Sequence, residues 1–273
     1  MPDQEGRVVL ITGASSGIGL ACARRLAQKG YRVFGTSRRA QPEMEEAFSW
    51  VQMDVDDESS VRQGVAEVLE RAGRLDVLIS NAGIGYAGAV EDTSLEEARE
   101  TFETNFFGTL RLCRAVLPHM RQRGSGRIVV IGSLAGLIAL PFQGLYSASK
   151  FALEGLCEAL RMEVRPFGIR VVLIEPGDTR TGFTAHRRWV RAARAGSAYE
   201  QAARRALAVQ EHDETHGVSP EWTARTVERV LRLRSPRLRY KAAGAFQRLA
   251  ASFKRFLPET WFEWGLRKYY RVD

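Results

Sequence analysis

Tyr146 and Lys150, in the stretch YSASK, are the first pair of side chains in this sequence with the types and spacing for proton chemistry. Four residues are about one helical turn, so in a helix both side chains would leave the same face and could reach one ligand. The pair could be a proton-donating phenol and an ammonium group that changes the pKa of that phenol. It also fits an ordinary piece of helix, and the spacing alone does not choose between them.

A glycine-rich turn lies near the N-terminus, in the stretch ITGASSGIGL. Its glycines stand at positions 13, 17 and 19, after a short apolar run and before a helix-like segment. Such glycines allow a tight turn and a close approach to a pyrophosphate, and the N-terminus of the following helix favours negative charge. We therefore predict a dinucleotide-binding turn rather than a purely structural one.

A second feature of nucleotide binding is the sequence Thr36-Ser37-Arg38-Arg39, about 20 residues after the glycines. Dinucleotide folds often carry an acidic residue here to hold the adenosine ribose. This chain has none, and two guanidinium groups could grip a 2′-phosphate instead. The pattern favours NADP(H) over NAD(H); the alternative is a solvated basic turn.

The elements that would position these residues alternate along the chain. Short apolar runs are separated by segments of helical periodicity, which predicts a doubly wound α/β fold with a parallel sheet of about seven strands and helices on both faces. The predicted strands are 7–12, 32–36, 50–54, 75–80, 127–132, 169–175 and 238–240. The main predicted helices are 18–28, 59–70, 95–117, 148–164 and 219–234. Ser94, Gly30 and Gly168 are expected to mark helix ends.

We predict one domain over residues 1–242 and an extension over 243–273. The regular alternation ends after Pro176, and residues 178–217 read as a mobile lid over a site. The C-terminal part is basic, since residues 225–273 hold 13 basic and 4 acidic residues, which leaves 27 and 28 for the rest of the chain. An electrostatic partner should therefore meet the C-terminal segment.

Composition excludes several classes of protein. Hydrophobic residues make up 45% and charged residues 26% of the 273, as in soluble globular proteins. Three scattered cysteines give little support to a disulfide framework or a metal site. No run of about 18 apolar residues and no signal-peptide pattern is present, so we expect a cytoplasmic protein.

Taken in order, the motifs resemble those of the short-chain dehydrogenases/reductases. They are Thr12-Gly13-x-x-x-Gly17-x-Gly19, Ser80-Asn81-Ala82-Gly83, Asn105, Ser133, Tyr146-x-x-x-Lys150 and Pro176-Gly177. The resemblance covers about residues 7–183 and implies a Rossmann-type fold and hydride transfer between a nicotinamide cofactor and a carbonyl or alcohol. Ser80 departs from the pattern, because many members have asparagine there, but Asn81-Ala82-Gly83 is retained.

The resemblance also implies a role for each matching residue. Tyr146 would exchange a proton with the substrate oxygen, Lys150 would stabilise the phenolate and hold the nicotinamide ribose, and Ser133 would hydrogen-bond the reacting oxygen. Asn105 would anchor a water that relays protons to Lys150. Residues expected to bind the cofactor, besides Tyr146 and Lys150, are Gly13, Ser15, Ser16, Gly17, Ile18, Gly19, Ser37, Arg38, Arg39, Asp54, Val55, Asn81, Ala82, Gly83, Pro176, Gly177, Thr179 and Thr181.

Within the family, the run LPFQGLYSASKFALEGLCEAL resembles the branch that includes 17β-hydroxysteroid dehydrogenase type 1 and the retinol dehydrogenases. That branch acts on lipophilic alcohols, ketones and retinoids, so we expect an apolar carbonyl or alcohol substrate. Candidate substrate contacts are Tyr86, Leu140, Pro141, Gln143, Phe183 and His186. Family members are often dimers or tetramers built on the helices at 95–117 and 148–164, so a homo-oligomer is expected.

Two further patterns leave alternatives open. His212 and His216 have a spacing compatible with two metal ligands, but no further ligand cluster supports them, and we predict no metal. The extension combines apolar residues at helical spacing with arginines and lysines, as in helices that lie on anionic membranes. Packing over the substrate pocket or in a subunit interface is the preferred reading. A non-catalytic NADP-binding or membrane-associated interaction protein is the alternative function, and no nucleic acid is expected.

Overall fold

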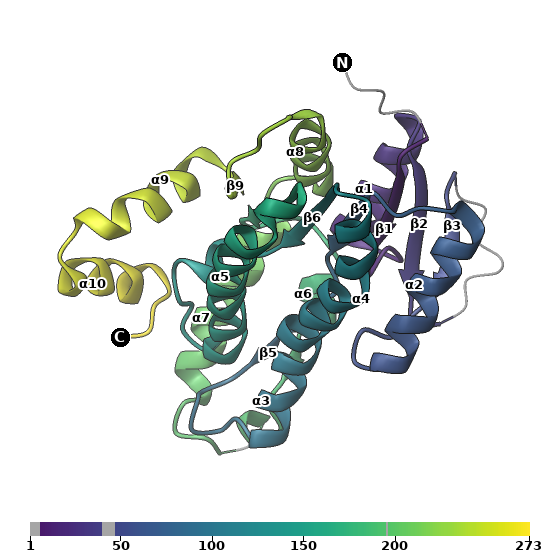
Figure 1. The fold of residues 1–273 in the computed structure, drawn as a ribbon. Helices are drawn as coiled ribbons and strands as arrows, with labels where there is room; N and C mark the ends of the chain where they lie inside the picture. Colours follow the sequence, from purple (N-terminus) through teal and green to yellow (C-terminus); the bar gives the residue numbers. More distant parts are fainter. Residues whose placement is uncertain (1–5, 40–46, 195) are drawn as a thin grey trace.

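A computed structural model describes residues 6–39, 47–194 and 196–273. Its centre is a parallel sheet of seven strands in the order β3-β2-β1-β4-β6-β7-β9 (Figure 1). The strands are β1 (Val8–Ile11), β2 (Arg32–Ser37), β3 (Ser49–Gln52), β4 (Val77–Ser80), β6 (Gly126–Ile131), β7 (Ile169–Pro176) and β9 (Arg239–Ala242). The predicted doubly wound fold is confirmed. Strand order reverses between β1 and β4, where such sheets open a crevice for ligands.

Helices cover both faces of the sheet. Helices α1 (Gly17–Gln28) and α8 (Pro220–Arg232) lie on one face, and α2 (Glu58–Ala72), α4 (Gly108–Gln122) and α5 (Gly144–Val164) lie on the other (Figure 1). Val8 and Leu10 of β1 pack toward the second layer, and Val9 and Ile11 pack toward the first. Because successive strand residues face opposite layers and both layers are apolar, the strands read as continuous apolar runs.

The segment predicted as one helix from Leu95 to Leu117 is interrupted by a wider turn. Helix α3 (Leu95–Phe102) continues through a π-helical turn, η1 (Glu103–Phe107), into α4. The predicted start is confirmed: the Ser94 hydroxyl accepts a hydrogen bond from the Glu97 backbone, and the Glu97 carboxylate accepts one from the Ser94 backbone. A π-turn places one residue outside the regular helical repeat, often at a functional position, and here it contains Asn105.

Helix α5 begins at Gly144, earlier than the predicted start at Ala148. Tyr146 therefore lies in its first turn and Lys150 in the next, on one helix as the four-residue spacing predicts. The helix continues into a short 3-10 turn, η3 (Arg165–Phe167), and Gly168 ends it with φ 73°. This left-handed conformation is readily accessible only to glycine, as expected for a residue that stops a helix.

The segment 178–217 contains α6 (Phe183–His186), β8 (Arg188–Trp189), the 3-10 turn η4 (Arg191–Arg194) and α7 (Glu200–Thr215). Strand β8 pairs with β5 (Tyr86–Ala87) in a separate two-stranded sheet. After β9, the extension forms a hairpin of α9 (Ala245–Phe253), the turn η5 (Lys254–Phe256) and α10 (Glu259–Tyr269), coloured yellow at the left of Figure 1. Within the described residues, no helix has the length and apolar character to span a bilayer.

Candidate active site

One cavity of about 1300 Å³ lies where the strands end, as expected for an open parallel sheet. It extends from the glycine-rich turn to the C-terminal extension. Most of the residues that the sequence singled out line it: Gly13, Ser15, Ser16, Gly17, Ile18, Ser37, Arg38, Arg39, Asp54, Val55, Asn81, Ala82, Gly83, Ser133, Leu140, Gln143, Tyr146, Lys150, Pro176, Gly177, Thr179, Thr181, Phe183 and His186. Residues separated by more than 150 positions in sequence are therefore brought to one site.

The glycine-rich turn is held against the end of β4 by Thr12 and Asn81. The Thr12 hydroxyl accepts hydrogen bonds from the backbone N–H groups of Asn81 (2.9 Å) and Ala82 (3.1 Å). The Asn81 amide donates in return to the carbonyl of Thr12 at 2.9 Å. These contacts fix the two loops that face each other across the crevice between β1 and β4.

Gly19 does not line the cavity, and its role is close packing. A Cβ atom at this position would lie 2.2 Å from the carbonyl oxygen of Gly13 and 2.6 Å from the Asn81 amide nitrogen. Helix α1 can therefore approach the turn only because residue 19 has no side chain. This agrees with the packing function of the last glycine in dinucleotide-binding turns.

The first turn of α1 fits an anionic group such as a pyrophosphate. Ser16 precedes the helix without a side-chain capping bond, and the first turn carries no acidic residue. Gly13 and Gly17 have φ of 63° and 55°, which allows the backbone to curve around the cavity. Backbone N–H groups at a helix N-terminus favour negative charge. The exposed side chains of Arg38 and Arg39 line the same end of the cavity.

Ser133, Tyr146 and Lys150 come together in the middle of the cavity. Burial raises the pKa of Tyr146 to about 12, and this outweighs a hydrogen bond from Ser133 that acts in the opposite direction. Burial also lowers the pKa of Lys150 to about 8. The Lys150 ammonium donates to the carbonyl of Ile131 at 3.1 Å and lies 5.7 Å from the centre of the Tyr146 ring. The phenol is thus held in its protonated form beside a buried cation.

Asn105 lies behind the cavity rather than in its lining. Its side chain accepts a hydrogen bond from the Ile84 backbone (2.9 Å) and donates to the Ile84 carbonyl (3.0 Å) and to the Ser149 hydroxyl (2.9 Å). It therefore connects the loop after β4 to helix α5, one residue before Lys150.

Ser80, the departure from the family pattern, is linked to the same turn. Its buried hydroxyl lies 3.0 Å from the Thr109 hydroxyl, which donates to the carbonyl of Asn105 at 3.0 Å. Because Thr109 donates its hydroxyl proton to that carbonyl, Ser80 is the donor in the hydrogen bond between the two hydroxyl groups. Ser80 thus holds the end of β4 against the π-turn, and the retained Asn81 still holds the glycine-rich turn.

Two predicted substrate residues, Tyr86 and Pro141, are not among those that line the cavity. The buried Tyr86 hydroxyl donates to Glu100 at 2.6 Å and accepts from Arg188 at 3.1 Å. The Pro141 carbonyl accepts from Gln210 at 3.0 Å. Tyr86 lies in β5 and Pro141 in the turn before α5, and an apolar or aromatic residue near the site gave no signal to separate a structural role from ligand contact.

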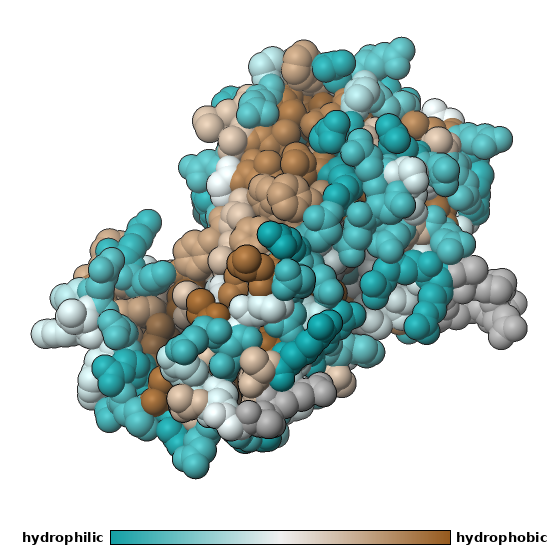
Figure 2. Space-filling model, turned by 90° about the horizontal axis from the view of Figure 1, so that it is seen from below, coloured by the Kyte–Doolittle hydropathy of each residue, from teal (hydrophilic) through white to brown (hydrophobic). Residues whose placement is uncertain are grey.

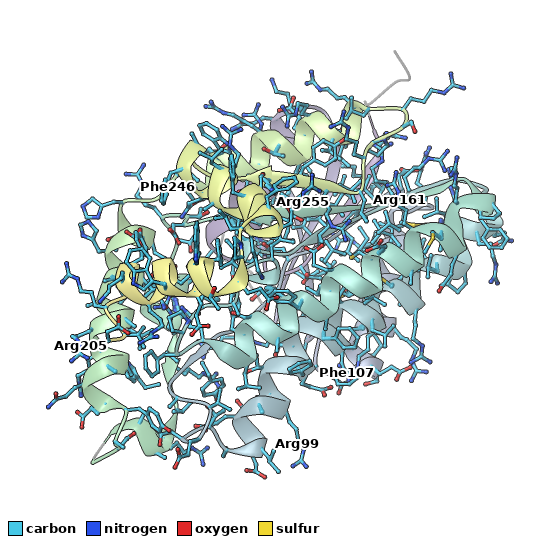
Figure 3. The ribbon with its side chains drawn as sticks, turned by 90° about the vertical axis from the view of Figure 1, so that its left-hand side faces the viewer. Arg99, Phe107, Arg161, Arg205, Phe246 and Arg255 are labelled. Atoms are coloured by element: carbon cyan, nitrogen blue, oxygen red, sulfur yellow. The ribbon has the colours of Figure 1, made fainter. Side chains whose placement is uncertain are left out.

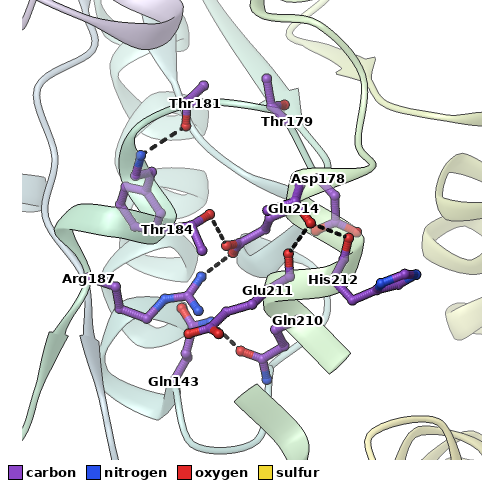
Figure 4. A network of polar contacts seen from close by, with 12 residues as sticks. Gln143, Asp178, Thr179, Thr181, Thr184, Arg187, Gln210, Glu211, His212 and Glu214 are labelled. Carbon is purple, nitrogen blue, oxygen red and sulfur yellow. Dashed lines mark hydrogen bonds and ion pairs between the residues drawn. The ribbon is translucent and has the colours of Figure 1, made fainter. Parts of the chain in front are cut away.

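Four carboxyl groups in the cavity were missed by sequence reasoning: Asp56, next to the predicted Asp54 and Val55, and Asp178, Asp213 and Glu214. Glu214 accepts hydrogen bonds from Thr184 and from Arg187, with which it forms an ion pair (Figure 4). Burial, followed by the charges of Asp213 and Glu214, raises the pKa of Asp178 to about 7. Three carboxyl groups therefore lie together here, with Asp178 part-protonated at neutral pH, and the cations nearby are Arg187, paired with Glu214, and Arg188 and Lys150 of the cavity lining.

The position of Asp178 directly after Pro176-Gly177 was the one local signal for this group. Asp213 and Glu214 lie between His212 and His216, which drew attention only as a metal-ligand spacing. The two imidazole rings lie 4.2 Å apart at the end of α7, and Nδ1 of His216 is 2.8 Å from the His212 carbonyl.

The C-terminal extension borders the end of the cavity that contains Asp178 and Asp213. Gln247 donates to the carboxylate of Asp178, the Tyr269 hydroxyl donates to Asp213 at 2.7 Å, and Lys254 donates to the carbonyl of Leu137 at 2.5 Å. The residues of the extension that line the cavity are Phe246, Gln247, Ala250, Leu257, Trp261, Phe262, Gly265, Leu266, Tyr269 and Tyr270. The sequence left membrane contact, interface and pocket cover open, and the structure shows that this segment borders the pocket.

Comparisons with known proteins agree with the geometry. A family model described as short chain dehydrogenase matches residues 7–191. The chain is 40% identical to 3-ketodihydrosphingosine reductase of Bacteroides thetaiotaomicron over 97% of this chain and 98% of that protein. It is 44% identical to human 17-beta-hydroxysteroid dehydrogenase type 1 over 64% of this chain and 58% of that protein. A solved short-chain dehydrogenase from Streptomyces avermitilis has a TM-score of 0.80 at 34% identity over 97% of each chain.

The family model covers more than half of the chain, and the Bacteroides relative matches it over nearly its full length. The resemblance to the 17β-hydroxysteroid and retinol dehydrogenase branch is confirmed, with human retinol dehydrogenase 8 at 42% identity. The chain belongs to the short-chain dehydrogenase/reductase family of oxidoreductases.

Proposed function

We propose that this protein uses NADPH to reduce a ketone on a long-chain, lipid-like amine. The observation that carries the proposal is the composition of the cavity of about 1300 Å³. Its phenol at Tyr146 lies between a glycine-rich turn suited to a dinucleotide and an end bordered by the aromatic extension. The full-length similarity to a 3-ketodihydrosphingosine reductase, extension included, supports the same assignment.

In this proposal the residues of the chain supply the proton and hold the ketone, and a bound nicotinamide supplies the hydride. Tyr146 keeps its proton at neutral pH, because burial raises its pKa to about 12, and donates it to the ketone oxygen. Ser133 hydrogen-bonds the same oxygen. Lys150 stabilises the phenolate that forms and holds the nicotinamide ribose. Asn105 fixes the loop beside Lys150, and its role in a water relay stays a prediction.

We assign the nucleotide to the end of the cavity at β1, β2 and β4. Arg38 and Arg39 would hold the 2′-phosphate by charge-assisted hydrogen bonds, which favours NADP(H). Asp54 and Val55 would flank the adenine. The remaining predicted contacts, on the turn from Gly13 to Gly19, on Asn81 to Gly83 and on Pro176 to Thr181, follow the family pattern.

The charge of the cavity supports an amine substrate. A 3-ketosphingoid base carries an ammonium group next to its ketone and a long alkyl chain beyond it. Asp178, Asp213 and Glu214 lie together in the lining, and Glu214 and Arg187 lie near enough to Tyr146 to influence its pKa in opposite directions. An ammonium beside the reacting ketone would pair with these carboxyl groups and favour the ionised form of Asp178, and the alkyl chain would lie along the extension.

The test compares 3-ketodihydrosphingosine with its N-acetyl derivative, which has no charge, and with a steroid ketone. NADPH consumption is followed for the native protein and Tyr146→Phe, and NADPH binding is measured by fluorescence titration. We expect the native protein to reduce the free amine with the highest kcat/KM. Tyr146→Phe should bind NADPH as the native protein does but reduce the ketone at least ~10²-fold more slowly, the usual contribution of a general acid.

Each other outcome changes the proposal in a defined way. Equal kcat/KM for the free and acetylated amines would show that the protein does not recognise the amine. A higher kcat/KM for the steroid would indicate a substrate like that of the 17β-hydroxysteroid dehydrogenases. NADPH binding without turnover of any ketone would favour the non-catalytic alternative.

We also propose that the protein forms a homo-oligomer through the outer faces of α4 and α5. Phe107 in the turn before α4, and Phe151 and Met162 on α5, are exposed large hydrophobic residues on this side of the sheet. Soluble monomeric proteins rarely expose large contiguous patches of such side chains, so this surface is a candidate subunit interface. Light scattering on a size-exclusion column would measure the number of subunits.

A further inference from the structure

The outer surface of the C-terminal extension is rich in exposed aromatic side chains. Of the 17 large hydrophobic side chains that are exposed among the described residues, eight lie on the extension. They are Phe246, Leu249, Phe253, Phe256, Leu257, Trp261, Trp264 and Tyr269. Phe246, Trp261 and Phe256 are 71%, 70% and 67% exposed. Figure 2 shows hydrophobic side chains at the surface of the lobe on the left, where the extension lies. A gathering of this kind marks an interaction site rather than random exposure.

The exposed surface is continuous with the reaction cavity. Phe246, Leu257, Trp261 and Tyr269 line the cavity and are also exposed to solvent, so they lie at its rim. A partner bound to the outer surface of the hairpin would therefore lie next to the opening of the cavity. The remaining exposed residues, which do not line the cavity, are Leu249, Phe253, Phe256 and Trp264.

The charge of the extension indicates what the partner is. Residues 243–273 contain six basic and three acidic residues. Arg255 lies on the hairpin with its guanidinium 4.6 Å from the ring centre of Phe256, so an aromatic and a cation share one patch. Figure 3, in which the extension faces the viewer, shows Phe246 and Arg255 on it. Tryptophan and tyrosine with neighbouring arginine and lysine are the side chains that settle at the boundary between lipid headgroups and acyl chains.

We propose that the hairpin of α9 and α10 docks on the surface of an anionic lipid bilayer and opens the cavity toward it. A second copy of the chain is a poorer partner, because self-association would bring together two segments that each carry a net positive charge, even with Arg267 and Lys268 paired to Asp273. The docking half of the proposal is independent of the reaction. The delivery half, in which a lipid-like substrate enters the cavity directly from the bilayer, rests on the proposed function.

Docking is tested by flotation of the full chain with vesicles of phosphatidylcholine alone and of phosphatidylcholine with phosphatidylglycerol. The test variant is Phe256→Ser/Trp264→Ser, because neither residue lines the cavity. The matched control is Phe167→Ser/Trp222→Ser, which removes the same two residue types from exposed positions outside the extension, at 44% and 47% exposure. Circular dichroism melting and NADPH titration establish that each variant folds.

We expect the native chain and the control to float with the anionic vesicles, and less with the neutral ones. The test variant should bind anionic vesicles roughly 30-fold more weakly, since two aromatic side chains no longer enter the lipid. High salt should also release the native chain, because the headgroup attraction is screened. Native-like binding by the test variant would overturn the docking proposal. So would a native chain that ignores vesicles but forms a dimer that the test variant cannot form.

Delivery has a separate readout. The test variant should reduce a short-chain, water-soluble ketone as fast as the native chain, yet reduce a long-chain keto-amine embedded in vesicles at least roughly 10-fold more slowly, in line with its lost binding. Equal loss on both substrates would refute delivery and indicate damage to the cavity. If the native chain binds vesicles but reduces no ketone, the proposed function fails while docking stands.

Discussion

Glu175 is a buried carboxyl group whose removal should make the protein less sensitive to rising pH. It lies at the end of β7 with no exposed surface, and its carboxyl group shares a hydrogen bond with the carboxyl group of Glu154. The closest cation is Arg239, whose Nε is 3.9 Å away and already donates to Glu154 at 2.7 Å. Burial, followed by the charge of Glu154, raises the pKa of Glu175 from 4.5 to about 7. The substitution we consider is Glu175→Gln, which has the same shape and no charge.

The sign of the effect follows from where the proton is bound. Below pH 4.5 Glu175 is protonated in both the folded and the unfolded chain, so its titration does not change the free energy of unfolding. Between pH 4.5 and about 7 the unfolded chain has lost the proton while the folded chain keeps it, and native stability falls with rising pH. A pKa change from 4.5 to about 7, at about 1.4 kcal/mol per unit, corresponds to roughly 3.5 kcal/mol. Because Glu175 and Glu154 influence each other's titration, the effect of Glu175 alone on the free energy of unfolding is at most this large.

The assay is urea unfolding followed by circular dichroism at several pH values between 5 and 8. The difference in unfolding free energy between Glu175→Gln and the native protein should grow in favour of the variant across this range, by up to about 3 kcal/mol. Glu158→Gln is the matched control, because Glu158 also pairs with Arg239, at 2.9 Å, but is exposed. A difference that stays constant with pH, or the same slope in the control, would refute the reasoning.

Two further substitutions test the nucleotide end of the cavity. Gly19→Ala should destabilise the protein by about 1–3 kcal/mol and weaken NADPH binding, because the added Cβ would lie 2.2 Å from the Gly13 carbonyl oxygen. The control is Gly155→Ala in α5, where a Cβ meets open space, and it should leave the melting temperature unchanged or raise it. Arg38→Gln should raise the KM for NADPH by about 10-fold or more, the loss of one charge-assisted hydrogen bond, and leave that for NADH little changed. An equal change with both cofactors would contradict the assignment of the 2′-phosphate.

Most of the fold could be predicted because its signals are local. Strands buried on both faces produce uninterrupted apolar runs, and Gly168 and Ser94 have the residue types that helix ends require. The π-turn around Asn105 could not be predicted, since the hydrophobic pattern continues through it and its cause is tertiary: Asn105 bonds to Ile84 and Ser149, far apart in sequence. For the same reason Tyr86 read as a ligand contact, although its hydroxyl is bound to Glu100.

The part of the site that escaped sequence reasoning is the part that would contact the substrate in the function we propose. The amphipathic pattern of the extension shows that one face is apolar but not what that face covers. Its position depends on single polar contacts, such as Gln247 with Asp178 and Tyr269 with Asp213, and neither residue type is a signal by itself. The nucleotide end was predicted in more detail because residues close together in the sequence meet its requirements, which are glycines without a Cβ and an exposed helix N-terminus.

The two perturbed groups at the centre of the site set the protonation state from which the proposed reaction starts. With a pKa of about 12, the phenol of Tyr146 is protonated at pH 7, and removing that proton costs roughly 7 kcal/mol. Oxidation of an alcohol needs the phenolate, whereas reduction of a ketone needs the phenol. Lys150 can stabilise that phenolate while its ammonium is protonated, below a pKa of about 8. The residues of the chain are therefore arranged to give a proton to an oxygen that is gaining negative charge, and oxidation would require further positive charge beside the phenol.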